Sequence, residues 1–450
     1  MINTGEEVIC VPSSAGTAKI PLSRLPAPRV WQRIAKHPMM FHYNRLIVVV
    51  LAVNLAVMAG SHSTDSAADA TLVNLTLAVL IRQRHVVNSL FAIARKVPNS
   101  WPLWIRRSAA KVYHFGGLHV GPSISAVLWF AVFTAELTQE RVRNPVAAPL
   151  TVLTLSYALI ALLLVTCVLA MPSVRQRWHN LFERSHRFLG WLSLLLFWLQ
   201  TIVSEWEMRG RTLTWRDLVS VPHLWVLLVV TVSVISPWTR LRKVPVSVSR
   251  PSSHVAILRF NYGWAPFNGS STVISHSPLK EWHAFAAIDA PDGNGYRVVV
   301  SRAGDWTAKF IDAPPTSIWV KGGSIRGMAS VESLFNRLVF VATGSGIGPT
   351  LTHLMSRPKE RPMTIVWVAR SPRRVFGDKL VDEVLDLVPN ACIVDTEING
   401  KPDMVALTYR VATDFRADGV ICVANKKVTW DVVYGLESRG IPACGPLWDS

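Results

Sequence analysis

Six apolar stretches dominate the first half of the chain and limit what it can fold into. They span residues 41–60, 67–81, 112–135, 147–171, 188–204 and 221–237. A helix needs about 20 apolar residues to cross a bilayer, so most of the stretches are long enough, although the second and fifth are short. Only 17% of the 450 residues are charged, against about 25% in soluble domains. The sequence therefore predicts a helical membrane domain of about six spans over residues 41–238.

Lysine and arginine alternate between the segments that join these stretches. Residues 1–40, 82–111 and 172–187 are rich in them, whereas residues 61–70 contain two aspartates and no basic residue. Because cytosolic loops of membrane proteins carry an excess of lysine and arginine, both termini are predicted to be cytosolic, in the plasma membrane or an internal membrane. The formal net charge of +18 follows these loops, so we expect a lipid bilayer as partner and no nucleic acid.

Residues 1–40 contain several prolines and no apolar core of the signal-peptide kind. They are predicted to form a disordered cytosolic lead-in. The five cysteines are scattered without a Cys-x-x-Cys pair, so neither a disulfide framework nor a zinc ribbon is expected, and buried free thiols are the simpler interpretation. They are Cys10, Cys167, Cys392, Cys422 and Cys444.

The composition changes after Pro237. Residues 244–330 contain short β-rich runs separated by Gly, Pro, Asn and Ser, which predicts a small antiparallel β-barrel. Residues 335–450 alternate apolar strands with helices, which predicts an α/β domain whose parallel sheet is covered on both faces.

A glycine-rich turn after the first strand of this α/β domain is the sharpest local signal. In VFVATGSGIGPTLTHL, residues 339–354, a buried strand runs into three glycines and then a helix that opens at Pro349. Backbone amides there can approach a pyrophosphate, and a helix N-terminus favours its negative charge. The alternative is an ordinary strand–helix turn. The predicted binding residues are Thr343, Gly344, Gly346, Ile347 and Pro349.

Basic residues follow the second strand of the domain. Arg370 ends that strand, and Arg373 and Arg374 come directly after it. An arginine at this point can pair with a 2′-phosphate, which favours NADPH over NADH. A solvated basic loop is an equally weighted alternative.

The part of the chain after the predicted membrane domain, residues 244–450, resembles the ferredoxin-reductase-type FAD/NAD(P)H module of ferric reductases and NADPH oxidases. The resemblance covers roughly residues 44–450 and implies FAD binding by His283, Phe285, Gly304, Asp305, Trp306 and Thr307. It also implies a catalytic role for Cys422, although Val423-Ala424 replace the usual Gly-Pro. The matching motifs are Trp282-His283-Ala284-Phe285-Ala286, Gly304-Asp305-Trp306-Thr307 on the following strand, and Thr343 to Pro349.

The membrane stretches resemble most closely the fungal membrane flavoproteins of the TmpA type. The similar segments are AKVYHFGGLHVG and RWHNLFERSHRFLGWLSLLLFWLQTI. This resemblance implies an electron-transfer role, often in signalling or secondary-metabolite biosynthesis. Reductases of the superfamily often end in an aromatic residue over the flavin, which implies that role for Trp448; a surface anchor or core tryptophan is the alternative.

Four histidines lie where a membrane electron-transfer domain would need ligands. They are His114 and His119 on the third stretch, and His179 and His186 around the start of the fifth. Neutral imidazole is an axial ligand for haem iron, so one residue from each stretch could hold a single inner b-type haem, with His119 and His186 as first choices. Equally open is the alternative that these histidines bind no haem and form hydrogen bonds at helix ends.

The superfamily carries a second histidine 13–14 residues along each of these helices, and this chain does not. His119 is followed at that spacing by Val132 and Phe133, and His186 by Leu199 and Gln200. A second, outer haem is therefore not expected, which argues against extracellular superoxide production or surface ferric reduction.

Together these features predict a membrane-bound flavoprotein oxidoreductase. Electrons would pass from NADPH through FAD to an inner haem or directly to a small organic acceptor. A transmembrane ferric reductase or NADPH oxidase is one alternative. An inactive scaffold or sensor that keeps the fold is another, supported by Ala284, Ala286 and the Val423-Ala424 replacement.

Overall fold

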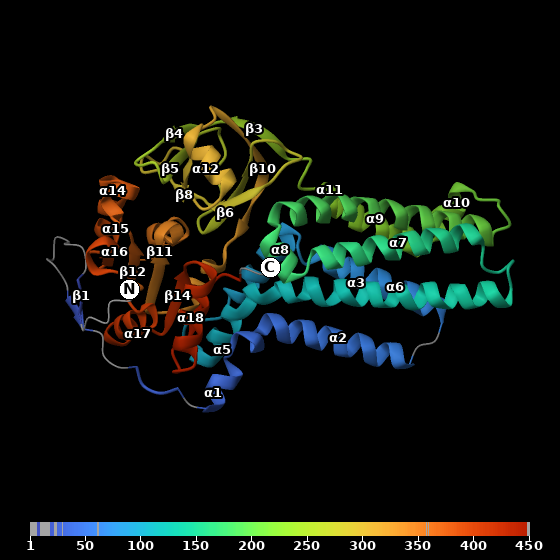
Figure 1. Ribbon diagram of the computed structural model, residues 1–450, viewed down its shortest axis with the longest axis horizontal. Coiled ribbons are helices and arrows are strands. Elements are labelled where there is room, and N and C mark those ends of the chain that lie inside the picture. The colour runs from blue at the N-terminus through green and yellow to red at the C-terminus, as the bar shows by residue number, and fades with distance from the viewer. Residues whose placement is uncertain are drawn as a thin grey trace.

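The computed structural model describes residues 7–9, 19–21, 25–28, 30–60, 63–356, 358 and 360–447. A bundle of long helices extends from one end of the molecule, and two β-containing units lie side by side at the other end (Figure 1). The predicted site residue Trp448 lies outside the described residues.

The six apolar stretches coincide with six helices of the bundle. Its buried contacts are made by Trp129, Phe130, Leu159, Phe197 and Leu227, whereas many outward-facing side chains are also apolar. The helices are α2 (His42–Gly60), α3 (Thr64–Leu80), α6 (Gly117–Arg143), α7 (Leu150–Leu169), α9 (His179–Met208) and α11 (Pro222–Ile235).

Four helical runs in the described part of the chain are long and apolar enough to cross a membrane: His42–Gly60, Leu103–Arg143, Leu150–Leu169 and His179–Met208. Helix α3 and the following α4 (Arg84–Ala94) are bent by 72° relative to each other and make a fifth candidate if counted as one span. Helix α11 has only 14 residues. Six spans therefore stay a prediction, because length and composition support four or five.

Part of the predicted disordered lead-in is ordered. Strand β1 (Glu7–Ile9) pairs antiparallel with β2 (Lys19–Pro21), and α1 (Val30–Ala35) leads into the short η1 (Pro38–Met40). Distant charges hold this segment, because Lys36 Nζ lies 3.3 Å from a carboxylate oxygen of Glu437. Such long-range contacts are invisible in local composition.

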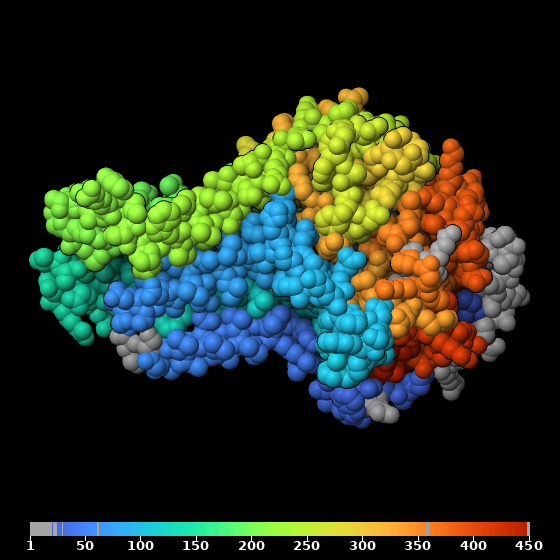
Figure 2. Space-filling model, turned by 180° about the vertical axis from the view of Figure 1, so that it is seen from behind, coloured from blue at the N-terminus to red at the C-terminus, as the bar shows by residue number. Residues whose placement is uncertain are grey.

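Short helices connect the bundle to the rest of the molecule. Figure 2 shows the light-blue segment around α4 and α5 lying against the orange part of the chain. Asn88 Nδ2 donates to the carbonyl of Ser324 at 3.1 Å, and Arg106 pairs with Asp418 at 2.8 Å. These connecting elements are α4, α5 (Leu103–Ala109) and η2 (Ala110–Gly116). Helix α8 (Pro172–Arg177) joins α7 to α9, and α10 (Trp215–Ser220) precedes α11 at the far end of the bundle (Figure 1).

The first β unit consists of two four-stranded antiparallel sheets rather than the single continuous sheet of the predicted small antiparallel β-barrel. Their strand orders are β3-β10-β6-β7 and β4-β5-β9-β8. The segment between His283 and Asp289 pairs with β6 before Ala287 and with β9 after it, so it passes from the first sheet to the second and forms a corner between them. The elements are β3 (Leu241–Pro245), β4 (Ser247–Ser249), β5 (Val255–Phe260), β6 (Ser270–Ser275), β7 (His283–Ala286), β8 (Ile288–Asp289), β9 (Tyr296–Ser301), α12 (Asp305–Asp312) and β10 (Ser317–Arg326).

The second unit is the predicted α/β domain with a parallel sheet. The strand order is β13-β12-β11-β14-β15, so the chain winds outward from β11 and then crosses to its other side. Helices α13 and α15 bury apolar side chains against one face of the sheet, and α17 and α18 against the other. The elements are η3 (Met328–Leu334), β11 (Leu338–Thr343), η4 (Gly344–Gly346), α13 (Ile347–Ser356), β12 (Met363–Ala369), α14 (Pro372–Phe376), α15 (Asp378–Leu387), β13 (Cys392–Asp395), α16 (Thr396–Asn399), α17 (Met404–Asp414), β14 (Gly419–Val423), α18 (Lys426–Glu437) and β15 (Ala443–Cys444).

Most of the cysteines that the structure describes are free thiols. Cys167, Cys422 and Cys444 are unpaired, as expected, whereas Cys392 at the start of β13 is disulfide-bonded. The expectation of free thiols therefore fails for Cys392.

Candidate functional site

The glycine-rich turn lies at the point where the sheet reverses its direction of winding. Strand β11 ends at Thr343, Gly344 and Gly346 bound a short 3-10 turn, and α13 begins at Ile347, slightly earlier than the predicted Pro349. Gly346 is pressed against the end of β14, because a Cβ at this position would collide with the carbonyl oxygen of Val423. Open α/β sheets bind ligands at such a switch point, beyond the carboxyl ends of their strands.

Helix α13 connects this turn to the β sandwich. A Cβ on Gly348 would lie 3.5 Å from the Cβ of Val299 in β9, so the helix packs closely on that strand. The backbone amide of Gly269 donates to Thr352 Oγ1 at 3.2 Å. The same helix therefore begins at the nucleotide-type turn and contacts β7, β8 and β9.

The Gly304–Thr307 motif begins a helix, and its predicted position on a strand is wrong. Helix α12 starts at Asp305, with Gly304 as its N-cap residue. The Thr307 hydroxyl oxygen accepts hydrogen bonds from the amides of Ala303 and Gly304, at 2.9 and 3.0 Å. This side-chain contact ends the extended segment and starts the helix, because it satisfies amides that a ladder would otherwise use.

His283 on β7 and Trp306 on α12 are brought together. Their ring centres are 4.2 Å apart with planes inclined by 33°, and the Trp306 ring also lies 6.2 Å from Phe285 and 5.2 Å from Phe310. Burial lowers the pKa of His283, which keeps the imidazole neutral near neutral pH. Its Nε2 is buried and has no hydrogen-bond partner within the described ranges.

These residues fit a flavin. A flavin ring needs aromatic contact and hydrogen bonds at its polar edge, and the site offers Trp306 and Phe285 for the first and the unpaired Nε2 of His283 for the second. Three residues of the sequence prediction therefore come together in space from two separate motifs.

Arg370 and Arg374 share one carboxylate at the carboxyl edge of the sheet. Arg370 Nη2 lies 3.1 Å and Arg374 Nη2 2.8 Å from oxygens of Glu397. A hydrogen bond from the Ser371 hydroxyl, with those from Arg370 and Arg374, lowers the pKa of Glu397 to about 2. Both guanidinium groups are largely exposed, so this cluster carries one net positive charge toward solvent.

Arg373 faces a different set of partners. It pairs with Asp378 at 3.1 Å and Asp382 at 2.8 Å. The sequence prediction of Arg370 omitted Arg374 and Glu397 from the site. Arg374 stands in the same basic run, which could have indicated it, whereas Glu397 comes from the next strand–helix unit.

The Cys422 side chain is fully buried within β14 and packs on the side of the sheet that α17 and α18 cover. Burial raises the pKa of its thiol to about 12, although a hydrogen bond with Thr429 opposes this shift. The thiol is therefore protonated at neutral pH, and its catalytic role stays a prediction.

Of the four candidate haem ligands, His119 and His186 face each other. Their ring centres are 6.2 Å apart. Two imidazoles this close could together hold one haem iron, which would supply one-electron transfer. His119 Nδ1 lies 2.8 Å from the carbonyl oxygen of Ala78, which fixes the ring and leaves Nε2 available.

The other two histidines lie elsewhere. His114 Nδ1 accepts a hydrogen bond from the amide of Tyr43 at 3.2 Å, and His179 packs on Phe182 with ring centres 6.5 Å apart. Among the described residues, no group of three or more His, Cys, Asp or Glu side chains could hold a metal ion. A ligand pair of His119 and His186 is consistent with this, because a haem needs only two axial protein ligands.

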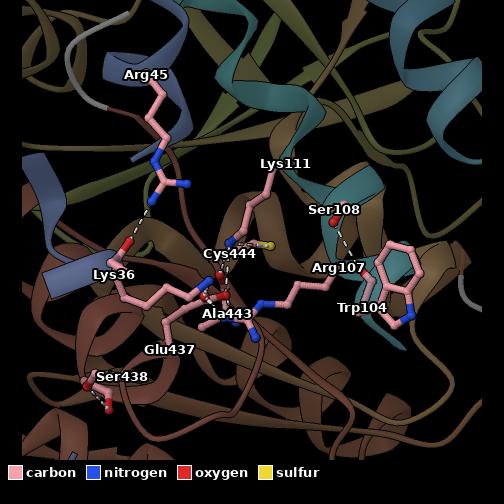
Figure 3. Close-up of polar contacts among 12 residues, drawn as sticks. Lys36, Arg45, Trp104, Arg107, Ser108, Lys111, Glu437, Ser438, Ala443 and Cys444 are labelled. Carbon is pink, nitrogen blue, oxygen red and sulfur yellow. Dashed lines mark hydrogen bonds and ion pairs between the residues drawn. The ribbon is translucent and has the colours of Figure 1, made fainter. Parts of the chain in front are cut away.

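A buried carboxylate fixes the α/β domain onto the bundle. Glu437 at the end of α18 lies 3.0 Å from Lys111 Nζ and 3.3 Å from Lys36 Nζ, and it also pairs with Arg107 (Figure 3). Burial opposes ionisation of Glu437, but Lys111, Arg107 and Lys36 outweigh it and lower its pKa to about 2. Sequence reasoning missed this cluster because its members are far apart in the chain and form no motif.

A family model matches the α/β domain. Residues 328–450 match the model described as "Adenylate-forming reductase 03009, C-terminal domain". Two curated proteins of Coprinopsis cinerea are also similar: adenylate-forming reductase 03009 is 43% identical over 429 residues and adenylate-forming reductase 06235 is 42% identical over 425 residues. These matches cover 93% of this chain, which spans only 41% of each relative's length.

Solved structures match the soluble half at low similarity. A ferredoxin NADP+ reductase from Neisseria gonorrhoeae with bound FAD and NADP has a TM-score of 0.37 at 16% identity, covering 46% of this chain and 98% of that one. A ferredoxin-NADP+ reductase from Plasmodium falciparum with 2′P-AMP has a TM-score of 0.35 at 12% identity, covering 46% of this chain and 94% of that one.

Proposed function

We propose that this chain is a membrane-bound flavoprotein reductase that takes electrons from NADPH through FAD and delivers them on the cytosolic side of a bilayer. One observation carries the proposal: α13 begins at the glycine-rich turn and packs along β7–β9, beside the strand that carries His283. A nicotinamide held at the turn and a flavin held at β7 would then lie next to each other.

The part of the proposal that concerns NADPH binding rests on charge and backbone geometry. Amides at the start of α13 face a turn that Gly346 keeps close to β14, which suits a pyrophosphate at the helix N-terminus. Arg370 and Arg374 supply the cationic surface for a 2′-phosphate. This arrangement supports NADPH over NADH.

The part of the proposal that concerns FAD binding rests on the aromatic cluster around His283. Trp306 and Phe285 supply ring contacts, and His283 Nε2 supplies a hydrogen bond. A bound FAD would supply the redox chemistry that takes up a hydride from the nicotinamide and passes electrons to an acceptor. The protein's part is to align the two rings and to exclude water from between them.

The names of the relatives support a reductase. Both are called adenylate-forming reductases, and this chain is similar to them over 93% of its own length. Because it spans only part of them, we propose the reductase activity alone for this chain. The acceptor that we propose is a small organic molecule, or an inner b-type haem on His119 and His186.

Two other functions are less well supported. A ferric reductase or NADPH oxidase that moves electrons across the bilayer needs outer ligands, and Phe133 and Gln200 occupy those positions as buried side chains. A scaffold without activity would not require the unpaired Nε2 of His283 beside an aromatic cluster.

The test is an anaerobic absorption spectrum of the detergent-purified protein before and after NADPH. We expect a flavin band that NADPH bleaches, and its loss in His283→Ala. The matched control is His254→Ala, which removes an exposed histidine of the same unit. A folded wild-type preparation without flavin, or a flavin that NADPH leaves oxidised, contradicts the proposal.

A further inference from the structure

We propose that the junction of α2, η2 and α18 binds an anionic phospholipid, with its phosphate in a polar pocket and an acyl chain in an adjoining apolar groove. The inference rests on the proposed membrane placement of α2. It assigns a lipid of defined charge to a place that the redox chemistry does not use.

The polar pocket carries an excess of positive charge. Its cavity is small, about 30 Å³, and its lining includes Lys36, Arg45, Lys111 and the carboxylate of Glu437. Three cations therefore face one anion, and Arg107, which pairs with Glu437, is a fourth cation beside them (Figure 3). Such a pocket favours a negatively charged ligand.

Among the cations that line the pocket, Arg45 is the one whose charge is least neutralised by a carboxylate. Its Nη2 donates to the carbonyl oxygen of Ala35 at 2.8 Å, and in the described part of the chain it forms no ion pair with a carboxylate. Lys36 and Lys111 already share Glu437. A guanidinium forms charge-assisted hydrogen bonds with phosphate, so Arg45 is the expected ligand of the head group.

An apolar groove continues from the pocket. It is an open groove of about 410 Å³, and it shares His42, Arg45 and Lys111 with the polar pocket, so the two spaces meet at the first turn of α2. The apolar lining comprises Leu46, Val49, Leu90, Ile93, Ala94 and Val112.

The groove needs an apolar occupant. Val49 and Ile93 are 58% and 66% exposed, on walls formed by α2 and α4. Helix α2 is long and apolar enough to cross a membrane, so a groove along it would open into the hydrocarbon of the bilayer. An acyl chain fits this position, whereas a small water-soluble anion leaves the groove uncovered.

The size of the pocket favours a compact head group. Its enclosed part holds only about two or three water-sized groups. Among phospholipid head groups, a phosphate without a substituent is the smallest, so it is the one that we assign to this space. The lipid that we assign is therefore of the phosphatidic acid type.

The experiment measures lipid retained by the full-length protein in detergent after exposure to equal amounts of phosphatidic acid and phosphatidylcholine with identical chains. Native mass spectrometry should show about one phosphatidic acid bound in preference to phosphatidylcholine. Losing one or two charge-assisted hydrogen bonds should weaken binding about tenfold in Arg45→Gln. Arg33→Gln, which removes an exposed arginine from α1, should leave binding unchanged.

A second variant separates a lipid from a free anion. Ile93→Gln should weaken long-chain phosphatidic acid and leave a short-chain analogue unaffected. Equal retention of the two lipids, equal loss in Arg33→Gln and Arg45→Gln, or displacement of the lipid by millimolar inorganic phosphate overturns the inference. Flavin content and NADPH oxidation are measured on the same samples, so lipid binding without flavin would refute only the proposed function.

Discussion

His283 and Trp306 come from different motifs and different elements, yet their rings lie 4.2 Å apart at the edge where β7 meets α12. The contact joins a histidine whose Nε2 is buried and unpaired to the largest aromatic side chain of the site. The pair defines where a flavin ring would lie.

Trp306→Ala should therefore abolish flavin retention while the protein stays folded. The indole also contacts Phe285 and Phe310, so its loss removes one wall of the site. Trp306→Phe should keep part of the flavin because an aromatic face remains. Flavin per protein after gel filtration is the measurement, and Trp215→Ala, at an exposed tryptophan, is the control. Full flavin content in Trp306→Ala would rule out this site.

Arg370→Ala and Arg374→Ala should each raise KM for NADPH about tenfold, the value of one lost charge-assisted hydrogen-bond pair, with KM for NADH unchanged. Arg373→Ala is the matched control, because its guanidinium pairs with Asp378 and Asp382. Glu397→Gln should lower KM for NADPH, since it frees both arginines from their shared carboxylate. The same increase in KM for NADPH and NADH in the arginine variants would argue against 2′-phosphate recognition.

These predictions use parts of the site that local sequence could reveal and parts that it could not. The glycine-rich turn and the six apolar stretches are local patterns, because helix length and turn chemistry depend on neighbouring residues. His283 is indicated by the resemblance of the segment around it to a flavin-binding motif. The pairing of Arg374 with Glu397 and the contact of Trp306 with His283 depend on which strand ends meet. The sheet change at Ala287 also results from tertiary packing, so a run of β-rich segments could not distinguish an open sandwich from a closed barrel.

Glu437→Gln should destabilise the protein by about 3–5 kcal/mol, because it leaves buried cations around Lys111 without their carboxylate. Asp292→Asn, in the exposed pair with Arg259, is the control and should cost much less, because solvent screens an exposed pair. Chemical denaturation monitored by circular dichroism measures both. Similar losses in the two variants would mean that Glu437 does not hold the α/β domain on the bundle.

The same carboxylate predicts a pH dependence. The pKa of Glu437 falls from its usual 4.5 to about 2 in the folded protein. Its contribution to stability is therefore complete above pH 4.5 and is lost as the pH falls toward 2. The melting temperature of wild type should fall more steeply over this window than that of Glu437→Gln. Parallel curves would contradict the prediction.

Lys321 predicts a second rise of stability with pH, this time at alkaline pH. Its ammonium lies 4.1 and 4.6 Å from the ring centres of Trp238 and Trp282, and burial, with a smaller contribution from Arg187, lowers its pKa from 10.5 to about 8. Between these values the unfolded chain holds a proton that the folded chain has lost, so stability should rise as the pH increases from 8 to 10.5. Lys321→Met should remove this rise. If the rise of stability with pH persisted in Lys321→Met, another titrating group would be responsible for it.

The facing pair of His119 and His186 leads to the last prediction. If the pair holds an inner haem, the purified protein should show a Soret band, and either His119→Leu or His186→Leu should abolish it, because each removes one of two axial ligands. His85→Leu, at an exposed histidine on α4, should leave the band unchanged. NADPH should still bleach the flavin in both ligand variants, since the flavin site is built from β7 and α12. Wild-type protein with a reducible flavin and no Soret band, even after reconstitution with hemin, would exclude the haem and leave a small organic molecule as the direct electron acceptor.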